Sequence, residues 1–224
     1  PSATQCLQAV GCAEAAVLYE RGVGGGSDAR FENDEVAYVS LGDGTTSEGE
    51  FWESLTTACV RKAPVVFHIE DNGYAISVPV EVQTPGGSLS HLVETWPNLK
   101  VIRVDGTDPI ASYAAFTEAV AHARARKGPA LVHSKVIRPY SHSLSDDEKL
   151  YKTAAEREAE ARRDPITRMQ HFLTSEGLAT DDELAAMLKD AELEVNEAAD
   201  KALAAEKPDR SSALDFVFSP DVDP

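Results

Sequence analysis

The chain has 224 residues, of which 38 are acidic and 21 basic, and its formal net charge at pH 7 is −17. This acidic balance argues against binding to nucleic acid or to an anionic membrane surface. No run of eighteen apolar residues, no signal-peptide pattern and no metal-type cysteine spacing occurs in the sequence, so we expect no membrane span and a cytoplasmic protein with reduced thiols.

The first part of the chain predicts one helix and one loop. An alanine-rich helix is expected from Gln8 to about Arg21, where small residues would let a neighbouring element pack closely. The glycine-rich stretch from Gly22 to Asn33 is expected to be a flexible surface loop without an assigned function.

Residues 35–73 predict a strand, a helix and a second strand. The apolar run 35–41 stops at Gly42-Asp43-Gly44, and the apolar run 64–69 stops at Glu70-Asp71-Asn72-Gly73. The hydroxyls of residues 45–47 are expected to cap a helix that runs to about Lys62. Such a unit requires a parallel, right-handed crossover. We therefore expect Asp43 and Asn72 at the same edge of the sheet, where open α/β sheets bind ligands.

The chemistry of this pair suits magnesium and a diphosphate. A carboxylate and an amide oxygen are hard donors, and magnesium takes few protein ligands and fills its octahedron with phosphate oxygens and water. Gly44 would allow a close backbone approach to an anion, and the following helix N-terminus would offer N–H groups. Each tripeptide alone more often forms an ordinary turn, but the two together at the ends of successive strands favour a binding site.

The middle of the chain continues the alternation of strands and helices. A loop over 74–87, a short helix over 88–94, a strand over 99–104, a helix over 109–127 capped by Asp108 and a strand over 130–137 are expected. The fold class predicted is α/β, a mostly parallel sheet with helices on both faces. His68 and His133 fall within strands and are expected to be satisfied core histidines.

The last third predicts a polar loop and then a helical extension. Residues 138–147 form a turn-rich loop after a strand, which composition alone makes a surface loop. Helices are expected over 148–163, 165–176 and 180–206, the last capped by Thr180 and carrying an apolar stripe that fits its own domain or a partner equally well. We expect an α/β ligand-binding domain over 1–147 and a helical extension with a partner-contacting tail over 148–224.

Two stretches resemble the alpha subunit of thiamine-diphosphate-dependent 2-oxoacid dehydrogenases. Gly-Asp-Gly-Thr-Thr-Ser-Glu-Gly-Glu-Phe-Trp-Glu (42–53) and Asp-Asn-Gly-Tyr-Ala-Ile-Ser-Val-Pro (71–79) resemble the branched-chain, 2-oxoisovalerate type more than the pyruvate type. The resemblance implies the thiamine-diphosphate-binding fold and magnesium held by Asp43, Asn72 and the Tyr74 carbonyl. It implies cofactor contacts by Ser2, Gly42, Asp43, Gly44, Thr45, Asn72, Ala75, Ile76 and His142.

The sequence departs from the pattern it resembles at Asp71, where the family usually has asparagine. We expect metal binding to survive, and the added negative charge to weaken diphosphate binding somewhat. The family's long N-terminal segment with further diphosphate contacts is also missing before Pro1, so a fragment or a contribution from another chain is expected.

The same resemblance implies that the loop over 138–147 takes part in the reaction. His142 matches a histidine that contacts the diphosphate side and helps to pass the acyl group to a lipoyl group, and Arg138 matches an arginine that steadies the loop. Ser143 matches a position that is phosphorylated in mitochondrial homologues, although regulation is not expected here. Thr4 and Gln5 match positions that help to hold a potassium ion.

The activity implied is oxidative decarboxylation of a 2-oxo acid, a branched-chain one favoured, with acyl transfer to a lipoyl domain of the core acyltransferase. No carboxylate for the cofactor's pyrimidine is identifiable, and in the family a beta subunit supplies it. We therefore expect half an active site, completed by a separate or fused beta subunit in a heterotetramer. A pyruvate-, acetoin- or transketolase-type thiamine enzyme and a non-catalytic fragment or assembly subunit remain as alternatives.

Overall fold

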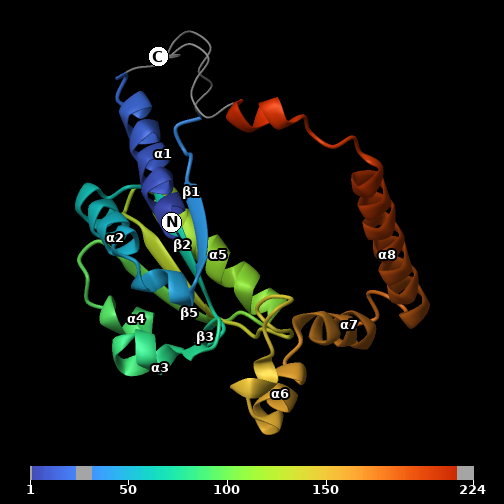
Figure 1. Ribbon diagram of the computed structural model, residues 1–224. Helices are drawn as coiled ribbons and strands as arrows, with labels where there is room; N and C mark the ends of the chain where they lie inside the picture. Colours follow the sequence, from blue (N-terminus) through green and yellow to red (C-terminus); the bar gives the residue numbers. More distant parts are fainter. Residues whose placement is uncertain (1, 24–31, 216–224) are drawn as a thin grey trace. The chain divides into compact units, whose positions relative to one another are not determined.

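The computed structural model describes residues 2–23 and 32–215, so most of the expected glycine-rich loop lies outside the described residues. The chain divides into two compact units, residues 1–169 and 170–224. The first unit contains a four-stranded sheet of order β1-β2-β6-β5 in which every pairing is parallel (Figure 1). Its strands are β1 (Ala37–Gly42), β2 (Val65–Asp71), β5 (Lys100–Asp105) and β6 (Ala130–Lys135).

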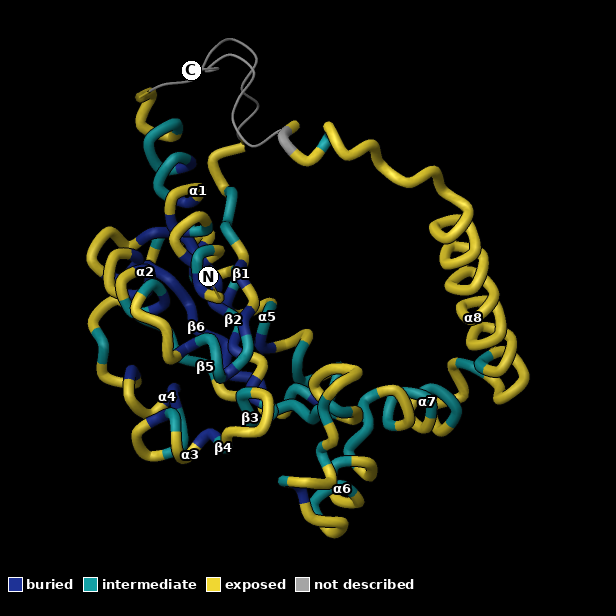
Figure 2. Tube along the Cα trace, viewed as in Figure 1, coloured by how far each residue is buried: buried dark blue, intermediate teal, exposed yellow. Residues whose placement is uncertain are grey.

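Helices cover both faces of this sheet, which confirms the predicted α/β class. On one face α1 (Thr4–Glu20) and α2 (Gly49–Arg61) pack against a core that includes Phe51 and Phe67. On the other face α5 (Pro109–Arg124) packs through small side chains against Val66 and its neighbours. Figure 2 shows the buried strands between these layers. Each large apolar side chain buried in this way stabilises the fold by about 1.5–3 kcal/mol relative to exposure.

The connection from β2 to β5 is more ordered than the loop and short helix expected there. A two-stranded antiparallel pair follows the end of β2, and two short helices and one 3-10 turn come next. These elements are β3 (Tyr74–Ala75), β4 (Val78–Pro79), α3 (Val80–Gln83), η2 (Pro85–Gly87) and α4 (Leu89–Leu92). Ile76, between β3 and β4, has φ of 57°, a left-handed conformation that is rare for a β-branched residue.

The expected caps of the second helix are wrong. Asp43–Ser47 form a separate 3-10 turn, η1, and α2 begins at Gly49 with Glu48 as its N-cap and without a side-chain cap. The reason is local, because the Thr46 hydroxyl donates to the Asp43 carbonyl at 2.6 Å and so closes the turn on itself. By contrast, Asp108 caps α5 as predicted and accepts from the N–H groups of Ile110 and Ala111.

The predicted helix over 148–163 is broken in two. A 3-10 turn η3 (Glu148–Leu150) is followed by α6 (Ala154–Ala161), which Thr153 caps. Lys152 lies between them with its side chain fully buried and ion-paired with Glu160 at 2.6 Å, and this buried pairing draws the chain out of a continuous helix. The next helix, α7 (Pro165–Ser175), agrees with the prediction.

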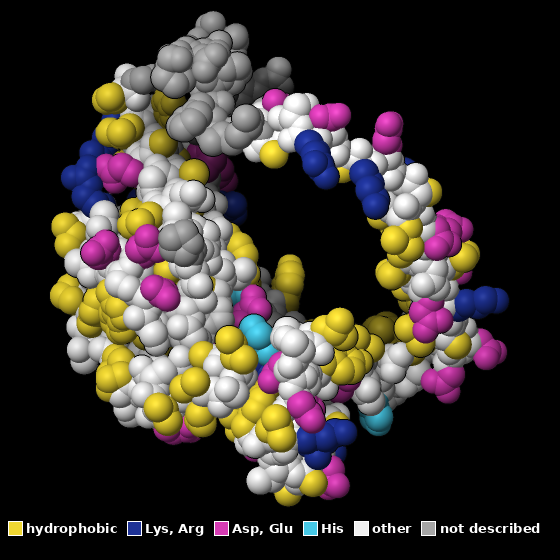
Figure 3. All heavy atoms as spheres, in the orientation of Figure 1, with side chains coloured by type: hydrophobic (Ala, Val, Ile, Leu, Met, Phe, Trp, Pro, Cys, Tyr) yellow, Lys and Arg dark blue, Asp and Glu magenta, His cyan; other side chains and the backbone are white. Residues whose placement is uncertain are grey.

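The second unit contains one long helix. α8 (Asp181–Ala204) starts with the predicted capping box of Thr180 and Glu183 and has no buried residue. Its apolar side chains are exposed among acidic ones (Figure 3). The predicted domain boundary after residue 147 stays a prediction, because a compact unit need not coincide with a functional domain. Among residues 2–23 and 32–215, no helix is long and apolar enough to cross a membrane.

Candidate functional site

Two polar segments meet at the carboxyl edge of the sheet. β1 and β2 run parallel with Gly42 opposite Glu70, so Asp43 and Asn72 leave the sheet side by side, as predicted. The Asn72 backbone N–H lies close enough to the Asp43 carboxylate to offset part of the rise in pKa that burial and Asp71 cause there. The structure thus brings these two predicted ligands together.

Asp43 is the most unusual side chain of this edge. It is only 3% exposed, and its Oδ2 accepts a hydrogen bond from Gln83 Nε2 at 2.9 Å. Its Oδ1 has no hydrogen-bond partner among the described residues. Burial raises the pKa of Asp43, and the nearby negative charge of Asp71 raises it further. A buried carboxylate with an unpaired oxygen is costly, and a cation at that oxygen would remove the cost.

The backbone after β2 is fixed by its own side chains. Asp71 Oδ1 accepts from the Gly73 N–H at 2.8 Å, and Asn72 Oδ1 accepts from the Tyr74 N–H at 3.0 Å. Gly73 adopts φ of 84°, the left-handed region that glycine favours. These successive Asx turns place Asn72 and the Tyr74 carbonyl on one short, ordered segment.

Gly44 is where the two segments come closest. A Cβ on Gly44 would lie 2.6 Å from the Cβ of Ala75, so only glycine allows η1 to approach β3 this closely. Thr45 and Ala75 are half-buried beside this contact, and Gly42 is half-buried at the end of β1. Four predicted cofactor-contacting residues therefore lie within one small region.

The donor set at this edge fits magnesium better than a transition metal. Within the described part of the chain, no group of three or more His, Cys, Asp and Glu side chains could hold a metal ion. Asp43, Asn72 and a backbone carbonyl supply one charged and two neutral oxygens, which leaves the other half of an octahedron to phosphate oxygens and water. The unpaired Oδ1 of Asp43 is the observation that fits a magnesium ion, whereas the close contact at Gly44 is made by Ala75 of this chain.

The predicted 138–147 loop begins at the same edge, because β6 is parallel to β2. Arg138 donates to the Ile76 carbonyl at 2.8 Å and to the Tyr151 hydroxyl at 2.6 Å. The Tyr151 hydroxyl donates to Asp146 Oδ2, which also accepts from the His142 backbone N–H at 2.8 Å. Arg138 thus holds the base of the loop, and His142 is exposed near its tip.

The remaining predicted residues lie at less organised positions. Ser2 is exposed just before α1, and Ile76 is 54% exposed between β3 and β4. The Thr4 hydroxyl donates to Glu50 at 3.2 Å, which does not by itself build a potassium site. Both predicted core histidines are satisfied, since His68 pairs with Tyr38 and Ser134 and His133 pairs with Asp71.

Three residues at the site were not predicted from the sequence. Gln83 orients the Asp43 carboxylate, Tyr151 joins Arg138 to Asp146, and Lys152 is buried next to the Tyr74 ring, 5.2 Å from its centroid. A lone Gln in a polar connection carries no pattern that separates it from a surface residue. The pair Tyr151-Lys152 follows a charged stretch, and the sequence alone does not show that it interrupts a helix. The interruption becomes understandable only when the burial of Lys152 is known.

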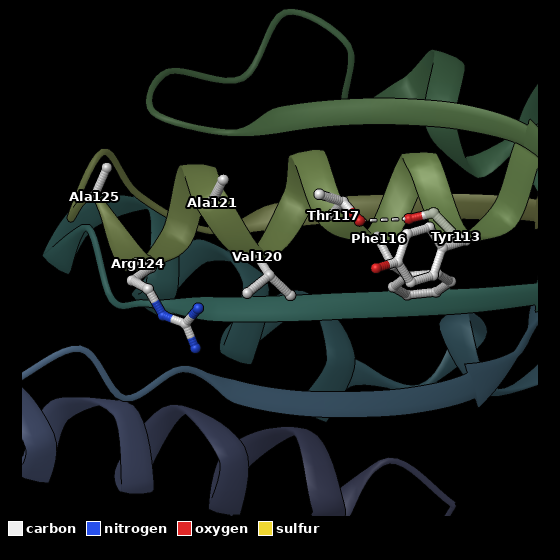
Figure 4. Close-up of a pocket in the computed structure, with 7 residues that line it drawn as sticks. All are labelled: Tyr113, Phe116, Thr117, Val120, Ala121, Arg124 and Ala125. Atoms are coloured by element: carbon white, nitrogen blue, oxygen red, sulfur yellow. Dashed lines mark hydrogen bonds between the residues drawn. The ribbon is translucent and has the colours of Figure 1, made fainter. Parts of the chain in front are cut away.

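A groove in this unit lies away from Asp43 and Asn72, and few reactive side chains line it. It measures about 680 Å³ and runs along α5, lined by Tyr113, Phe116, Thr117, Val120, Ala121, Arg124 and Ala125 (Figure 4). The Thr117 hydroxyl is already donated to the Tyr113 carbonyl at 2.8 Å. We therefore place the candidate site at Asp43 and Asn72.

Comparison with known proteins gives an independent result. The family model described as "Dehydrogenase E1 component" matches residues 1–211. A 3-methyl-2-oxobutanoate dehydrogenase subunit alpha of Mycobacterium tuberculosis is 39% identical over 178 residues, which cover 80% of this chain and 45% of that protein. A 2-oxoisovalerate dehydrogenase subunit alpha of Bacillus subtilis is 34% identical over 219 residues, which cover 98% of this chain and 62% of that protein.

Relatives of another substrate class match as well. A pyruvate dehydrogenase E1 component subunit alpha of Bacillus subtilis is 35% identical over 168 residues, 75% of this chain and 45% of that protein. A transketolase structure from Campylobacter jejuni aligns with a TM-score of 0.48 at 24% identity and covers 60% of this chain and 20% of that one. The chain spans about half the length of the relatives from Mycobacterium tuberculosis and Bacillus subtilis that it matches, or somewhat more.

Proposed function

Because the chain belongs to the dehydrogenase E1 component family, we propose that it is the alpha part of a thiamine-diphosphate-dependent 2-oxoacid dehydrogenase. One observation carries the proposal. Asp43 and Asn72 leave adjacent parallel strands side by side, and the buried Asp43 carboxylate has an unpaired oxygen at a place where a cation would be stabilised.

Magnesium would be held by Asp43, Asn72 and the Tyr74 carbonyl. Gly42 at the end of β1, Gly44 and Thr45 of η1, and Ala75 and Ile76 of the β3–β4 segment would line the cofactor. Ser2 is kept in the proposal as a contact to the pyrimidine. Potassium is left out, because the Thr4 hydroxyl already donates to Glu50.

The cofactor supplies the carbon nucleophile and the electron sink for decarboxylation when it is bound. The task of this chain's residues is to anchor the diphosphate and to serve the acyl-transfer step. We assign that second task to His142, which lies on the loop whose base Arg138 fixes to Ile76 and Tyr151. An exposed imidazole on such a loop is accessible to an incoming lipoyl domain.

The partners proposed are a beta subunit, separate or fused, and a lipoyl domain of the core acyltransferase. A carboxylate must face the pyrimidine nitrogen so that the cofactor's amino group acts as a base. The described ends of β1, β2 and β5 offer Asp43, Asp71 and Asp105, and all three have other roles. Asp43 faces the proposed metal, Asp71 is paired with His133 and Lys135, and Asp105 is paired with Arg163 and Arg168. A partner is therefore needed to complete the active site, which fits an α/β heterotetramer.

The substrate favoured is a branched-chain 2-oxo acid. Two observations support this choice. The sequences of residues 42–53 and 71–79 resemble the branched-chain type, and two relatives have names that specify 3-methyl-2-oxobutanoate or 2-oxoisovalerate. A pyruvate-type enzyme is the second candidate, because a pyruvate dehydrogenase alpha subunit matches at a similar identity.

The test is decarboxylation by the intact native complex, followed with an artificial electron acceptor. 3-Methyl-2-oxobutanoate and pyruvate are compared in parallel, with the Asp43→Ala complex as the control. A branched-chain preference that Asp43→Ala abolishes while assembly persists supports the proposal. Preference for pyruvate keeps the mechanism and changes the substrate. Turnover of neither with cofactor bound points to another thiamine enzyme, and an intact complex that binds no cofactor points to an assembly subunit.

A further inference from the structure

One face of the sheet becomes charged where three parallel strands end. Within each strand alternate residues share a face, so Asp71 continues the buried row of β2, while Lys135 and Asp105 continue the equivalent rows of β6 and β5. The register places Asp71 opposite Lys135 and Lys135 opposite Asp105. The result is a row of alternating charge, negative, positive and negative, that lines a cleft of about 440 Å³.

Asp71 is the anchor of this row. Its side chain is 3% exposed, and its Oδ2 accepts from His133 Nε2 at 2.8 Å. Its Oδ1 accepts from Lys135 Nζ at 3.0 Å. These two contacts engage both carboxylate oxygens of Asp71 and set a positive charge beside them.

The same carboxylate shapes the segment that carries the proposed magnesium ligands. Asp71 Oδ1 also accepts from the Gly73 N–H at 2.8 Å, and the Val136 N–H donates to the Asp71 carbonyl at 2.9 Å. Asn72 lies between these two fixed points, and its own Oδ1 accepts from Tyr74. Any rotation of Asp71 would move the backbone on which Asn72 and the Tyr74 carbonyl are presented.

The row also acts on the site through charge. Lys135 Nζ lies 3.0 Å from Asp71 Oδ1, so a positive charge stands beside the carboxylate that precedes Asn72. Without Lys135, the negative charge of Asp71 would lie near the proposed anionic diphosphate with no cation beside it. Lys135 therefore offsets the weakening of diphosphate binding that the negative charge of Asp71 is expected to cause.

We propose that His133 and Lys135 are positioning residues of the cofactor site, which clamp and neutralise Asp71 so that Asn72 and the Tyr74 carbonyl meet magnesium in a fixed geometry. The inference rests on the proposed function. Neither residue touches the cofactor in this proposal, and both act through Asp71 and the turn after it. Residues that orient metal ligands in this way commonly change metal affinity about 10–100-fold when they are replaced.

The experiment measures magnesium binding to the native complex at saturating thiamine diphosphate, by titration calorimetry. Lys135→Met removes the charge and keeps much of the stem, and we expect the magnesium Kd to rise about tenfold. Lys127→Met makes the same change at an exposed lysine before the opposite end of β6, and should leave the Kd unchanged.

Rescue separates positioning from a general structural role. Asp71→Asn keeps a side-chain oxygen for the Gly73 N–H but removes the charge, so the double variant Asp71→Asn with Lys135→Met should recover most of the lost affinity. His133→Gln, which retains an N–H donor, should bind magnesium more tightly than His133→Leu. Melting temperatures of the cofactor-free complexes identify any variant that fails to fold.

The outcomes are distinguishable. If the wild-type complex binds no magnesium with thiamine diphosphate, the proposed function fails and this inference fails with it. If the wild type binds and folded Lys135→Met binds equally well, or if Asp71→Asn brings no recovery, the clamp is overturned and the proposed function stands.

Discussion

The two halves of the proposed site are built in opposite ways. The metal-binding half, residues 42–44 and 71–75, is formed by strand ends and buried side chains, and a Cβ does not fit at its closest contact. The loop half, residues 138–147, is held by a short series of hydrogen bonds through Arg138, Tyr151 and Asp146. Its outer side chains are open to solvent, with Tyr140 at 79% exposure.

This difference matches the two tasks proposed. A diphosphate anchor binds best when its geometry is rigid. Magnesium demands near-ideal octahedral geometry, so a misplaced ligand lowers the affinity for the metal. A loop that meets an incoming lipoyl domain gains from exposed contacts and from a low cost of local opening. Changes in the first region should therefore abolish binding, whereas changes in the second should slow acyl transfer and leave binding intact.

The largest effect is expected at Asp43. Asp43→Asn replaces a buried, partly unpaired carboxylate by a neutral amide, so magnesium affinity should fall about a hundredfold or more. The cofactor-free protein should become more stable by about 1–3 kcal/mol, because an unsatisfied buried charge is removed. Thermal unfolding with and without magnesium thiamine diphosphate measures both effects. Asp190→Asn on exposed α8 is the matched control, and a lower melting temperature for cofactor-free Asp43→Asn would contradict the account.

Gly44→Ala should give the next largest effect. The new Cβ would lie 2.6 Å from that of Ala75, and forcing η1 away from β3 should cost about 1–3 kcal/mol of unfolding free energy and weaken cofactor binding. Gly49→Ala is the control, since its Cβ meets nothing within 4 Å. Adding Ala75→Gly should restore part of the loss. Denaturant unfolding measures the unfolding free energy of all three variants. Equal destabilisation by Gly44→Ala and Gly49→Ala would contradict the close contact between Gly44 and Ala75.

A smaller and different effect is expected at Tyr151. Tyr151→Phe removes the hydroxyl that joins Arg138 to Asp146, so hydrogen exchange in residues 138–147 should speed up. Acyl transfer to a lipoyl domain should slow about tenfold, in the range of a lost charged hydrogen bond, with cofactor affinity unchanged. Tyr140→Phe, at an exposed tyrosine of the same loop, should do neither. A loss of cofactor affinity in Tyr151→Phe would remove the distinction between the two regions.

The smallest effect is a pH dependence of the cofactor-free protein. The pKa of Asp43 is raised by burial and by Asp71, so the folded state binds its proton more tightly than the unfolded chain does. Asp43 therefore disfavours folding as the pH rises from the ordinary aspartate pKa, about 3.9, through its higher folded value. The difference in stability between Asp43→Asn and wild type should grow over that interval, as measured by unfolding at each pH. A difference that shrinks as the pH rises would reverse the sign we assign.

The sequence predicted those parts of the structure that depend on local pattern. Apolar runs ending in Gly42-Asp43-Gly44 and Asp71-Asn72-Gly73 predicted two parallel strands that end at one edge, and the sheet confirms that arrangement. Asp108 and Thr180 were recognised as caps because a cap is read from a few adjacent residues.

What the sequence did not predict depends on register or on burial. The pairing of Asp71 with His133 and Lys135 joins residues more than sixty positions apart, and it follows only once β2 and β6 are known to be neighbours. The break between η3 and α6 depends on the burial of Lys152, which a charged sequence conceals. Thr45 and Thr46 resembled caps, but the turn closed on the Asp43 carbonyl instead.

The most direct test of the account is to locate the metal. Manganese replaces magnesium in such oxygen sites, and anomalous diffraction from crystals of the native complex grown with manganese and thiamine diphosphate would show its position. We predict one manganese ion bound by Asp43, Asn72 and the Tyr74 carbonyl, with the remaining ligands from diphosphate and water. Thiamine diphosphate bound with its metal held by other residues, or manganese absent from the edge where β1 and β2 end, would contradict the account.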